Sequence, residues 1–347
     1  MNKIIICLMC ALVGASEDAH GTDSFYNDAK LIFHALNPQY NSPELQGYDP
    51  ARAHEVTAMM LDEFVLQNPD LTTQMKDRLS NIQKSLSRAR QNYLTCIEFV
   101  AAPDATREHE VALRLADDVK DLANDQLAPS LLFAGGHYII SENGFLCGHT
   151  TTYHVSRQEN GKLQFIINNT GTKSDTYHEN VADRTNQLVY TDLEADELDE
   201  HFWKSVIQTN FNNPVSSNML MISFYTSIET LLYKGTNKIS GRPLKRQKAG
   251  ICAWKSLSTW LHEAISPGRL KNDRNALDEI VYVRFKKFMF ENMLANFNPP
   301  LSFKATIGKS SNNPEEFYVE DQAAIDFMKS ELTRKIQKLE EKIKFNL

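Results

Sequence analysis

The Asn160-Gly161 pair constrains the fold of this chain more than any other short feature, because it separates two runs of β-branched and aromatic residues. The first run extends from Phe145 to Val155 and the second from Leu163 to Ile167. Asn and Gly tolerate the positive φ angles that a tight reversing turn requires, so the pattern predicts a β-hairpin. With the short runs at 131–133 and 138–140, it predicts antiparallel sheet over residues 130–170.

Predicted helices lie on both sides of this predicted sheet, and they either have an apolar stripe at helical spacing or are more broadly apolar. They are Ala51 to Leu66, Asp70 to Val100, Arg107 to Leu127, Asn218 to Tyr233, Ala276 to Phe297 and Gln322 to Phe345. The acidic stretch Asp192 to Asp199 indicates a solvated loop or a helix start. Antiparallel strands and helices that are segregated along the chain indicate an α+β protein.

The length of 347 residues allows two structural units or one elaborated domain. Changes of pattern divide the chain into four parts. They are an apolar N-terminus at 1–20, a helical N-terminal region at 21–129, a sheet-containing core at 130–268 and a helical C-terminal region at 269–347.

The N-terminus has two interpretations. Lys3 precedes an apolar run from Ile4 to Ala15 that ends in small residues, as in a secretory signal peptide, and the run is short for a membrane span. A buried first helix or strand is the alternative. The five cysteines favour that alternative, because their odd number and irregular spacing fit reduced thiols better than a disulfide framework or a zinc site. They are Cys7, Cys10, Cys96, Cys147 and Cys252.

The formal net charge of -7 argues against general nucleic-acid binding, which normally requires a basic face. A local basic cluster, Arg242, Lys245, Arg246 and Lys248, is an exception. It would favour a nearby thiolate or attract an acidic partner, although a solvated loop is the commoner explanation. We expect no cofactor, no metal ion and no stable membrane span.

Cys252 opens a segment whose apolar residues fall on one helix face, and Gln247 stands five residues before it. A cysteine at a helix start feels the positive end of the helix dipole, which favours thiolate over thiol. Gly250 allows the backbone to bend tightly, and the Gln247 amide is of the kind that donates to a developing oxyanion. The segment predicts a nucleophilic cysteine, and a buried cysteine beside an unrelated glutamine is the alternative.

A thiol nucleophile needs a histidine that takes its proton and a third group that orients the imidazole. His149 lies near the start of the long hairpin strand, and the returning strand ends at Asn168-Asn169. A two-residue turn places His149 on the sheet face of Asn168, whereas a bulge or a longer loop places it on the face of Asn169. His154 competes with His149 by the same alternation, and His137 and His178 are weaker candidates.

The order of these residues resembles that of the ubiquitin-like-protein proteases of the adenain type, and especially effector proteases of intracellular bacteria. The resemblance covers roughly residues 130–265. Its most specific pieces are Gly148-His149, Asn169-Thr170-Gly171 and the stretch from Gln247 to Trp254.

The resemblance implies an antiparallel-sheet cysteine protease core in which each of four residues has a role. His149 is the base, Asn169 orients it, Gln247 is the oxyanion-hole donor and Cys252 is the nucleophile. The family usually has Asp in place of Asn169, and one more residue between its Gln and Cys.

The activity implied is removal of ubiquitin or a ubiquitin-like modifier from a target protein, so the modifier and the target are the expected partners. The resemblance also implies secretion by a bacterium and action in the host cytoplasm, with a cytoplasmic protein as the alternative. The Glu-rich C-terminal helix, which ends at Leu347, resembles a type IV secretion signal or is an ordinary charged helix. An acetyltransferase-type effector would use the same Cys and His, and a non-catalytic adaptor would bind through the helices at 51–127 and 269–347.

Overall fold

The computed structural model describes residues 40–41, 50–101, 104–124, 130–140, 146–171, 177–181, 184–211, 217–232, 237–245, 252–267, 275–296, 303–307, 315–319 and 322–346. This part of the chain combines α-helices with antiparallel sheets, which confirms the expected α+β class. The apolar run from Ile4 to Ala15, with Cys7 and Cys10, lies outside the described residues.

The main sheet has six strands in the order β2-β3-β4-β6-β5, with β7 paired to β6. They are β2 (Leu131–Ile140), β3 (Leu146–Arg157), β4 (Leu163–Asn168), β5 (Asn180–Val181), β6 (Arg184–Leu193) and β7 (Asn237–Lys245). Every pairing is antiparallel. A second sheet contains β1 (Tyr40–Asn41), β8 (Phe303–Ile307) and β9 (Glu315–Val319).

The predicted hairpin is present as β3 and β4, and its loop is longer than a two-residue turn. The N–H of Gln158 donates to the carbonyl of Lys162 at 2.7 Å, and the N–H of Gly161 donates back to Gln158 at 3.0 Å. Gly161 has a φ of 85°, which completes a three-residue loop of the kind that ends in a left-handed glycine. The register pairs Thr152 with Asn168. Continuing that pairing puts Asn169, and not Asn168, on the sheet face of His149.

The helices predicted before and after the sheet are all present. The α-helices of the described chain are α3 (Pro50–Gln67), α4 (Thr73–Ala101), α5 (Ala105–Asn124), α7 (Glu200–Phe211), α8 (Ser217–Leu231), α9 (Cys252–Ile265), α10 (Ala276–Asn296) and α11 (Gln322–Asn346).

Several elements differ from the sequence expectations. The runs at 131–133 and 138–140 are one strand, β2, and the acidic stretch Asp192 to Asp199 ends β6 and forms a short 3-10 helix, Ala195–Leu198, before α7. The sequence pattern does not predict β6, since its buried positions include polar residues such as Thr185 and Gln187. The region at 269–347, expected to be helical, also contains β8 and β9.

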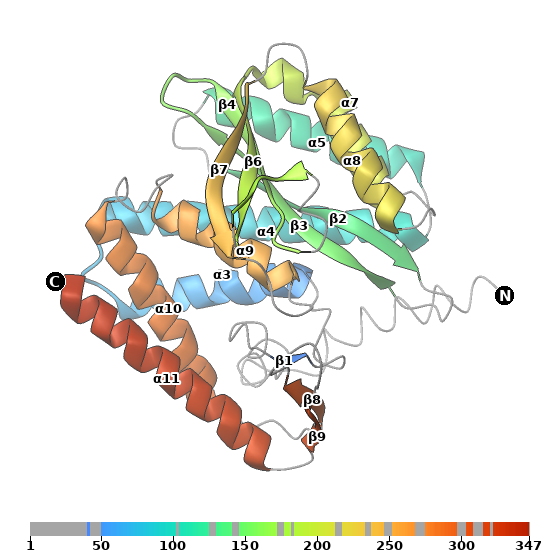
Figure 1. Ribbon diagram of the computed structural model, residues 1–347. Helices are drawn as coiled ribbons and strands as arrows, with labels where there is room; N and C mark the ends of the chain where they lie inside the picture. The colour runs from blue at the N-terminus through green and yellow to red at the C-terminus, as the bar shows by residue number, and fades with distance from the viewer. Residues whose placement is uncertain are drawn as a thin grey trace.

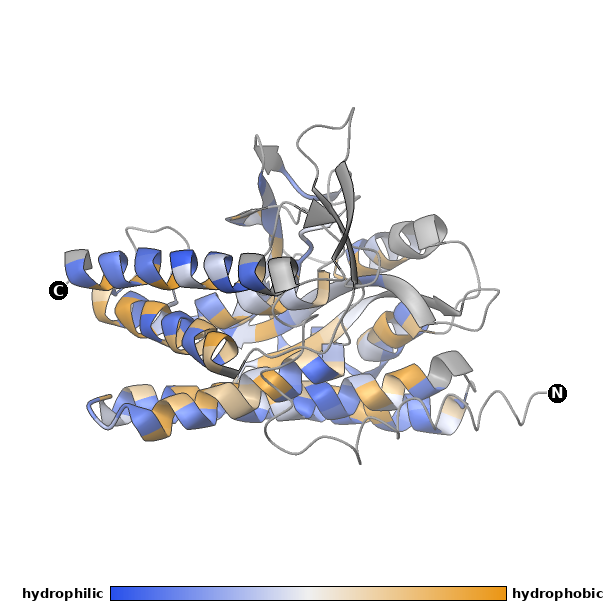
Figure 2. Cartoon of the chain, turned by 90° about the horizontal axis from the view of Figure 1, so that it is seen from below, coloured by the Kyte–Doolittle hydropathy of each residue, from blue (hydrophilic) through white to orange (hydrophobic). Residues whose placement is uncertain are grey.

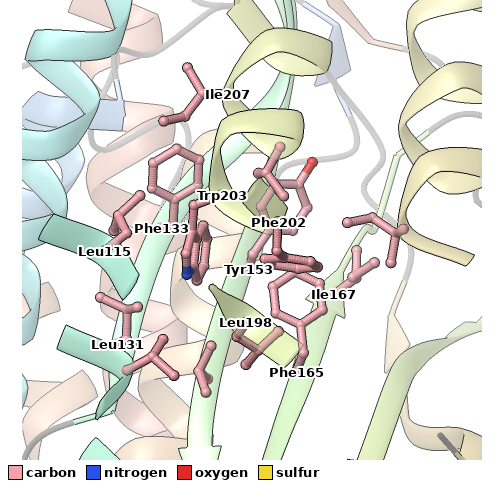
Figure 3. Packing of buried hydrophobic residues seen from close by; sticks show 14 of the residues in the cluster. Leu115, Leu131, Phe133, Tyr153, Phe165, Ile167, Leu198, Phe202, Trp203 and Ile207 are labelled. Carbon is pink, nitrogen blue, oxygen red and sulfur yellow. The ribbon is translucent and has the colours of Figure 1, made fainter. Parts of the chain in front are cut away.

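The main sheet lies between two helical layers (Figure 1). Helices α5, α7 and α8 cover one face, and their apolar side chains form a cluster with those of β2, β3, β4 and β6. Figure 3 shows its centre, where Phe133, Tyr153 and Phe165 of the strands pack against Phe202 and Trp203 of α7. These five side chains are almost completely buried, so the face of β3 that carries Tyr153 is rigidly supported.

Helix α9 packs on the other face with α3 and α4, and α10 and α11 extend this layer. In Figure 2, hydrophobic and hydrophilic residues recur turn by turn along the long helices, as expected of amphipathic packing. Leu257 and Trp260 of α9 share one cluster with Phe285 of α10 and Leu332 of α11. Helices on either side of residue 268 therefore hold α9, and with it Cys252, against the sheet.

Candidate active site

Cys252 is the first residue of α9, and its side chain is partly buried beside β3. Its sulfur accepts a hydrogen bond from the backbone N–H of Thr150 on β3 at 3.4 Å. The N–H groups of the first helical turn have no acceptor within the helix, so this end of α9 is electropositive. Both features favour the thiolate, as the sequence predicts for a helix-opening cysteine.

His149 of β3 is hydrogen-bonded to Cys252, and the two side chains shift each other's pKa. Burial by itself disfavours both charged forms, lowering the pKa of His149 and raising that of Cys252. Burial is opposed by the hydrogen bond and the charge interaction between the pair, by the hydrogen bond of Asn169 to His149 and by that of Thr150 to Cys252, and together these outweigh it. The pKa of His149 therefore lies above its ordinary value and that of Cys252 below it. This arrangement favours a thiolate–imidazolium pair.

Asn169 follows the end of β4 and orients the imidazole. Its Oδ1 lies 2.9 Å from Nε2 of His149 and also accepts the N–H of Gly171 at 3.0 Å. Since Nε2 is held by Asn169, Nδ1 is the ring nitrogen left to face the sulfur of Cys252. Asn169 is completely buried, so water does not compete for these bonds.

Gly171 packs directly against the His149 ring. A Cβ added at Gly171 would lie 2.0 Å from Cε1 of His149 and 2.6 Å from Nε2, far inside van der Waals contact. The motif Asn169-Thr170-Gly171 thus has two functions in this geometry. Its asparagine binds the ring edge, and its glycine leaves room for the ring.

The alternative pair, His154 and Asn168, lies on the opposite face of the sheet. His154 is buried, its pKa is lowered by that burial, and its Nδ1 lies 3.4 Å from Nδ2 of Asn168. Asn168 accepts a hydrogen bond from Gln187 on β6, which also donates to Glu263 of α9. This network fastens α9 to the sheet, and it does not bring His154 to Cys252.

His178 is not placed as a base for Cys252, but it is hydrogen-bonded to a residue that touches Asn169. Tyr225 of α8 accepts a hydrogen bond from Nδ2 of Asn169 at 3.3 Å, and its hydroxyl lies 2.6 Å from Nε2 of His178. The sequence pattern does not single out Tyr225, because it stands within an apolar helix where a core position is the default. The one hint in the sequence is indirect: His178, a weaker candidate for the base, is the hydrogen-bond partner of Tyr225.

Other predicted residues fall partly outside the described chain. Gln247 lies outside it, as do Arg246 and Lys248, and only the backbone of His137 and Cys147 is described. Within the basic cluster, Arg242 and Lys245 belong to β7 and not to a solvated loop. The guanidinium of Arg242 donates to Nδ1 of His262 at 2.6 Å, in the last turn of α9 and away from Cys252.

The described residues contain no group of three or more His, Cys, Asp or Glu side chains that could hold a metal ion. In the same part of the chain, no helix combines the length and the apolar character needed to cross a membrane. The sequence matches no family model and no curated protein. The described geometry joins a thiol, an imidazole and a side-chain amide in one series of hydrogen bonds.

Proposed function

We propose that this protein is a cysteine isopeptidase that removes ubiquitin or a ubiquitin-like modifier from target proteins. One observation carries the proposal. Cys252, His149 and Asn169 come from three separate segments and converge with the contacts that thiol catalysis requires. The resemblance to ubiquitin-like-protein proteases assigns these roles to the same three residues. We therefore take the substrate, ubiquitin or a ubiquitin-like modifier, from that resemblance. On the same ground we propose a secreted effector that acts in the host cytoplasm.

In this mechanism the Cys252 thiolate attacks the carbonyl carbon at the modifier's C-terminus. The negative charge that develops on the carbonyl oxygen is stabilised by N–H groups at the start of α9 and, by the resemblance, by Gln247. The imidazolium of His149 gives its Nδ1 proton to the leaving amine as the C–N bond breaks, which leaves a thioester on Cys252.

Hydrolysis of that thioester restores the enzyme. His149, now neutral, takes a proton from water at Nδ1, and the hydroxide attacks the thioester carbonyl. The C–S bond breaks and returns the thiolate, which pairs again with the imidazolium. Asn169 holds the ring through Nε2 in both steps, so that Nδ1 always serves the sulfur side.

The direct test is incubation with ubiquitin, and with a panel of ubiquitin-like modifiers, that carry a C-terminal electrophile. We expect a covalent adduct that maps to Cys252 and is absent from Cys252→Ala. Cys96 is the internal control, since it is completely buried and burial raises the pKa of its thiol. No adduct with any modifier would overturn the isopeptidase proposal, and acetylation of Cys252 by acetyl-CoA would instead favour the transferase.

A further inference from the structure

We infer that Tyr225 and His178 are positioning residues that fix the proton on Nε2 of His149 by setting the orientation of the Asn169 amide. The inference rests on the proposed function, because it concerns how the same Cys252–His149 pair is prepared. The residues form one chain of hydrogen bonds from the Asn186 backbone to the His149 ring. Each link has a direction, which follows from the groups at the two ends.

The far end of the chain is a backbone carbonyl, which can only accept. Nδ1 of His178 lies 2.8 Å from the carbonyl oxygen of Asn186 on β6, so this nitrogen carries the proton. His178 is buried, and burial lowers its pKa to about 4. At neutral pH its Nε2 is therefore a bare acceptor, and the Tyr225 hydroxyl 2.6 Å away must donate to it.

With its proton committed to His178, the Tyr225 oxygen is an acceptor for Asn169. Nδ2 of Asn169 donates to it at 3.3 Å, which turns the amide oxygen toward His149. Oδ1 then accepts from Nε2 of His149, so this nitrogen carries a proton in both charge states of the ring. Nδ1 is left to take the proton of Cys252.

A second backbone group fixes the same direction independently. The N–H of Gly171 can only donate, and it points at Oδ1 of Asn169 at 3.0 Å. A flipped amide would place NH2 against this N–H and against the protonated Nε2, and it would also lose its bond to Tyr225. Flipping would thus force His149 into the opposite tautomer, with its proton on Nδ1 and no base facing the sulfur.

The surroundings keep His178 neutral and hold Tyr225 in place. Burial lowers the pKa of His178 most. The hydrogen bond to the Asn186 carbonyl opposes that effect, and Lys238 of β7, which is paired with Glu229 of α8, adds to it. Glu179, which follows His178 in the sequence, accepts a hydrogen bond from the side-chain amide of Asn186. The Tyr177 ring stacks on Tyr225 with centroids 4.2 Å apart. Removing the Tyr225 hydroxyl alone should therefore leave the packing intact.

The test compares Tyr225→Phe with Tyr177→Phe, which removes a hydroxyl from the stacked ring outside the hydrogen-bond chain. The first readout is the rate of Cys252 alkylation by iodoacetamide against pH. We expect Tyr225→Phe to raise the apparent thiol pKa by about one unit, which is roughly a tenfold loss of rate near pH 6, and Tyr177→Phe to behave as wild type.

The second readout is the tautomer of His149, measured by ¹⁵N NMR in a Cys252→Ala background where the ion pair is absent. We expect the ring to carry its proton on Nε2, and this preference to weaken when Tyr225→Phe is added. A purely structural role for Tyr225 would move neither the tautomer nor the thiol titration.

A second pair of variants tests His178 and serves if Tyr225→Phe does not fold. His178→Leu removes the acceptor for the Tyr225 hydroxyl, whereas His178→Gln offers an amide oxygen in place of Nε2. We expect His178→Leu to shift the thiol titration upward and His178→Gln to recover part of the loss. Wild-type profiles for Tyr225→Phe or His178→Leu, or equal shifts in Tyr225→Phe and Tyr177→Phe, would overturn the inference.

Neither readout uses a ubiquitin substrate. A wild-type protein whose Cys252 titrates as expected but forms no modifier adduct would overturn the proposed function and leave this chain of hydrogen bonds supported. If wild type and Tyr225→Phe form the modifier adduct equally well and their thiol titrations are the same, the proposed function is supported and this inference is overturned.

Discussion

Oδ1 of Asn169, an uncharged acceptor, lies 2.9 Å from Nε2 of His149 and accepts the hydrogen bond that this nitrogen donates. The hydrogen bond to this amide raises the pKa of His149 less than Cys252 does, and a carboxylate in its place would stabilise the imidazolium more strongly through its charge. The hydrogen bond and charge interaction with Cys252 are therefore what raise the pKa of His149 most, against the burial that lowers it. The positive charge on His149 is therefore stabilised mainly by the Cys252 thiolate, and a change of either neighbour should move the pKa of His149.

Asn169→Asp should raise the pKa of His149 further, by roughly one to three units, because it places a negative charge against Nε2. The ring titration followed by NMR would measure this. Asn168→Asp is the matched control, since both asparagines are completely buried and Asn168 faces the other side of the sheet. Both variants should lose stability through the buried charge, but only Asn169→Asp should move the His149 titration. An equal movement in both would contradict the assigned faces.

Gly171→Ala should disable the site while the fold survives. The new Cβ would fall 2.0 Å from Cε1 of His149, so the ring must leave its position between Asn169 and Cys252. We expect a loss on the order of 100-fold in release of a fluorophore from the ubiquitin C-terminus, since misplacement of a catalytic group by about 1 Å can cost this much.

Gly161→Ala provides the contrast for that variant. Gly161 has a φ of 85°, so alanine there is strained and should cost about 1 kcal/mol in the free energy of unfolding. Its site lies at the far end of the hairpin, and activity per folded molecule should be unchanged. Urea unfolding and the fluorophore assay should be run on both variants. We expect Gly161→Ala to lose stability but keep its activity, and Gly171→Ala to lose activity while it remains folded. Matching losses of activity would contradict the steric role of Gly171.

The protein should lose stability as the pH falls below about 6.5, the ordinary histidine value. Burial lowers the pKa of His54 to about 3 and that of His178 to about 4, and it also lowers the pKa of His154. The unfolded chain therefore binds more protons than the folded one as pH falls. Each such histidine contributes up to about 1.4 kcal/mol per pH unit until its folded pKa is reached.

His54→Gln isolates one of these contributions. Urea unfolding at pH 6.5 and 5.5 should show a smaller loss of unfolding free energy in this variant than in wild type, by about 1 kcal/mol. Comparing the two proteins cancels the contributions of the other titrating groups. Equal pH dependence would show that His54 is not held neutral in the folded state.

The sequence was sufficient to predict the hairpin and every helix except α7, but it did not decide which of two neighbouring asparagines lies beside His149. The choice of Asn169 over Asn168 depended on whether the loop at Asn160-Gly161 has two residues or three. Asn-Gly occurs in both kinds of loop, so local composition does not decide the register. The face of each histidine follows only after the pairing is known.

Strand β7 was not predicted, because Gly241-Arg242-Pro243 is typical of a basic loop and not of a strand. This segment is a strand because its backbone pairs with β6, a contact between distant parts of the chain that local composition does not show. Tyr225 was missed for a different cause. Its ring belongs to the core pattern of α8, and only the partners of its hydroxyl distinguish it from a packing residue.

The titration of the Cys252 thiol, with and without its histidine, tests the activated pair most directly. Alkylation of Cys252 is measured by mass spectrometry from pH 5 to pH 10 in wild type and His149→Ala, with Cys96 as the unreactive reference. The wild-type midpoint should lie below the ordinary cysteine value, and that of His149→Ala should lie higher than in wild type, because burial is then opposed only by the Thr150 hydrogen bond and the start of α9. A midpoint that is the same in both proteins would contradict the account.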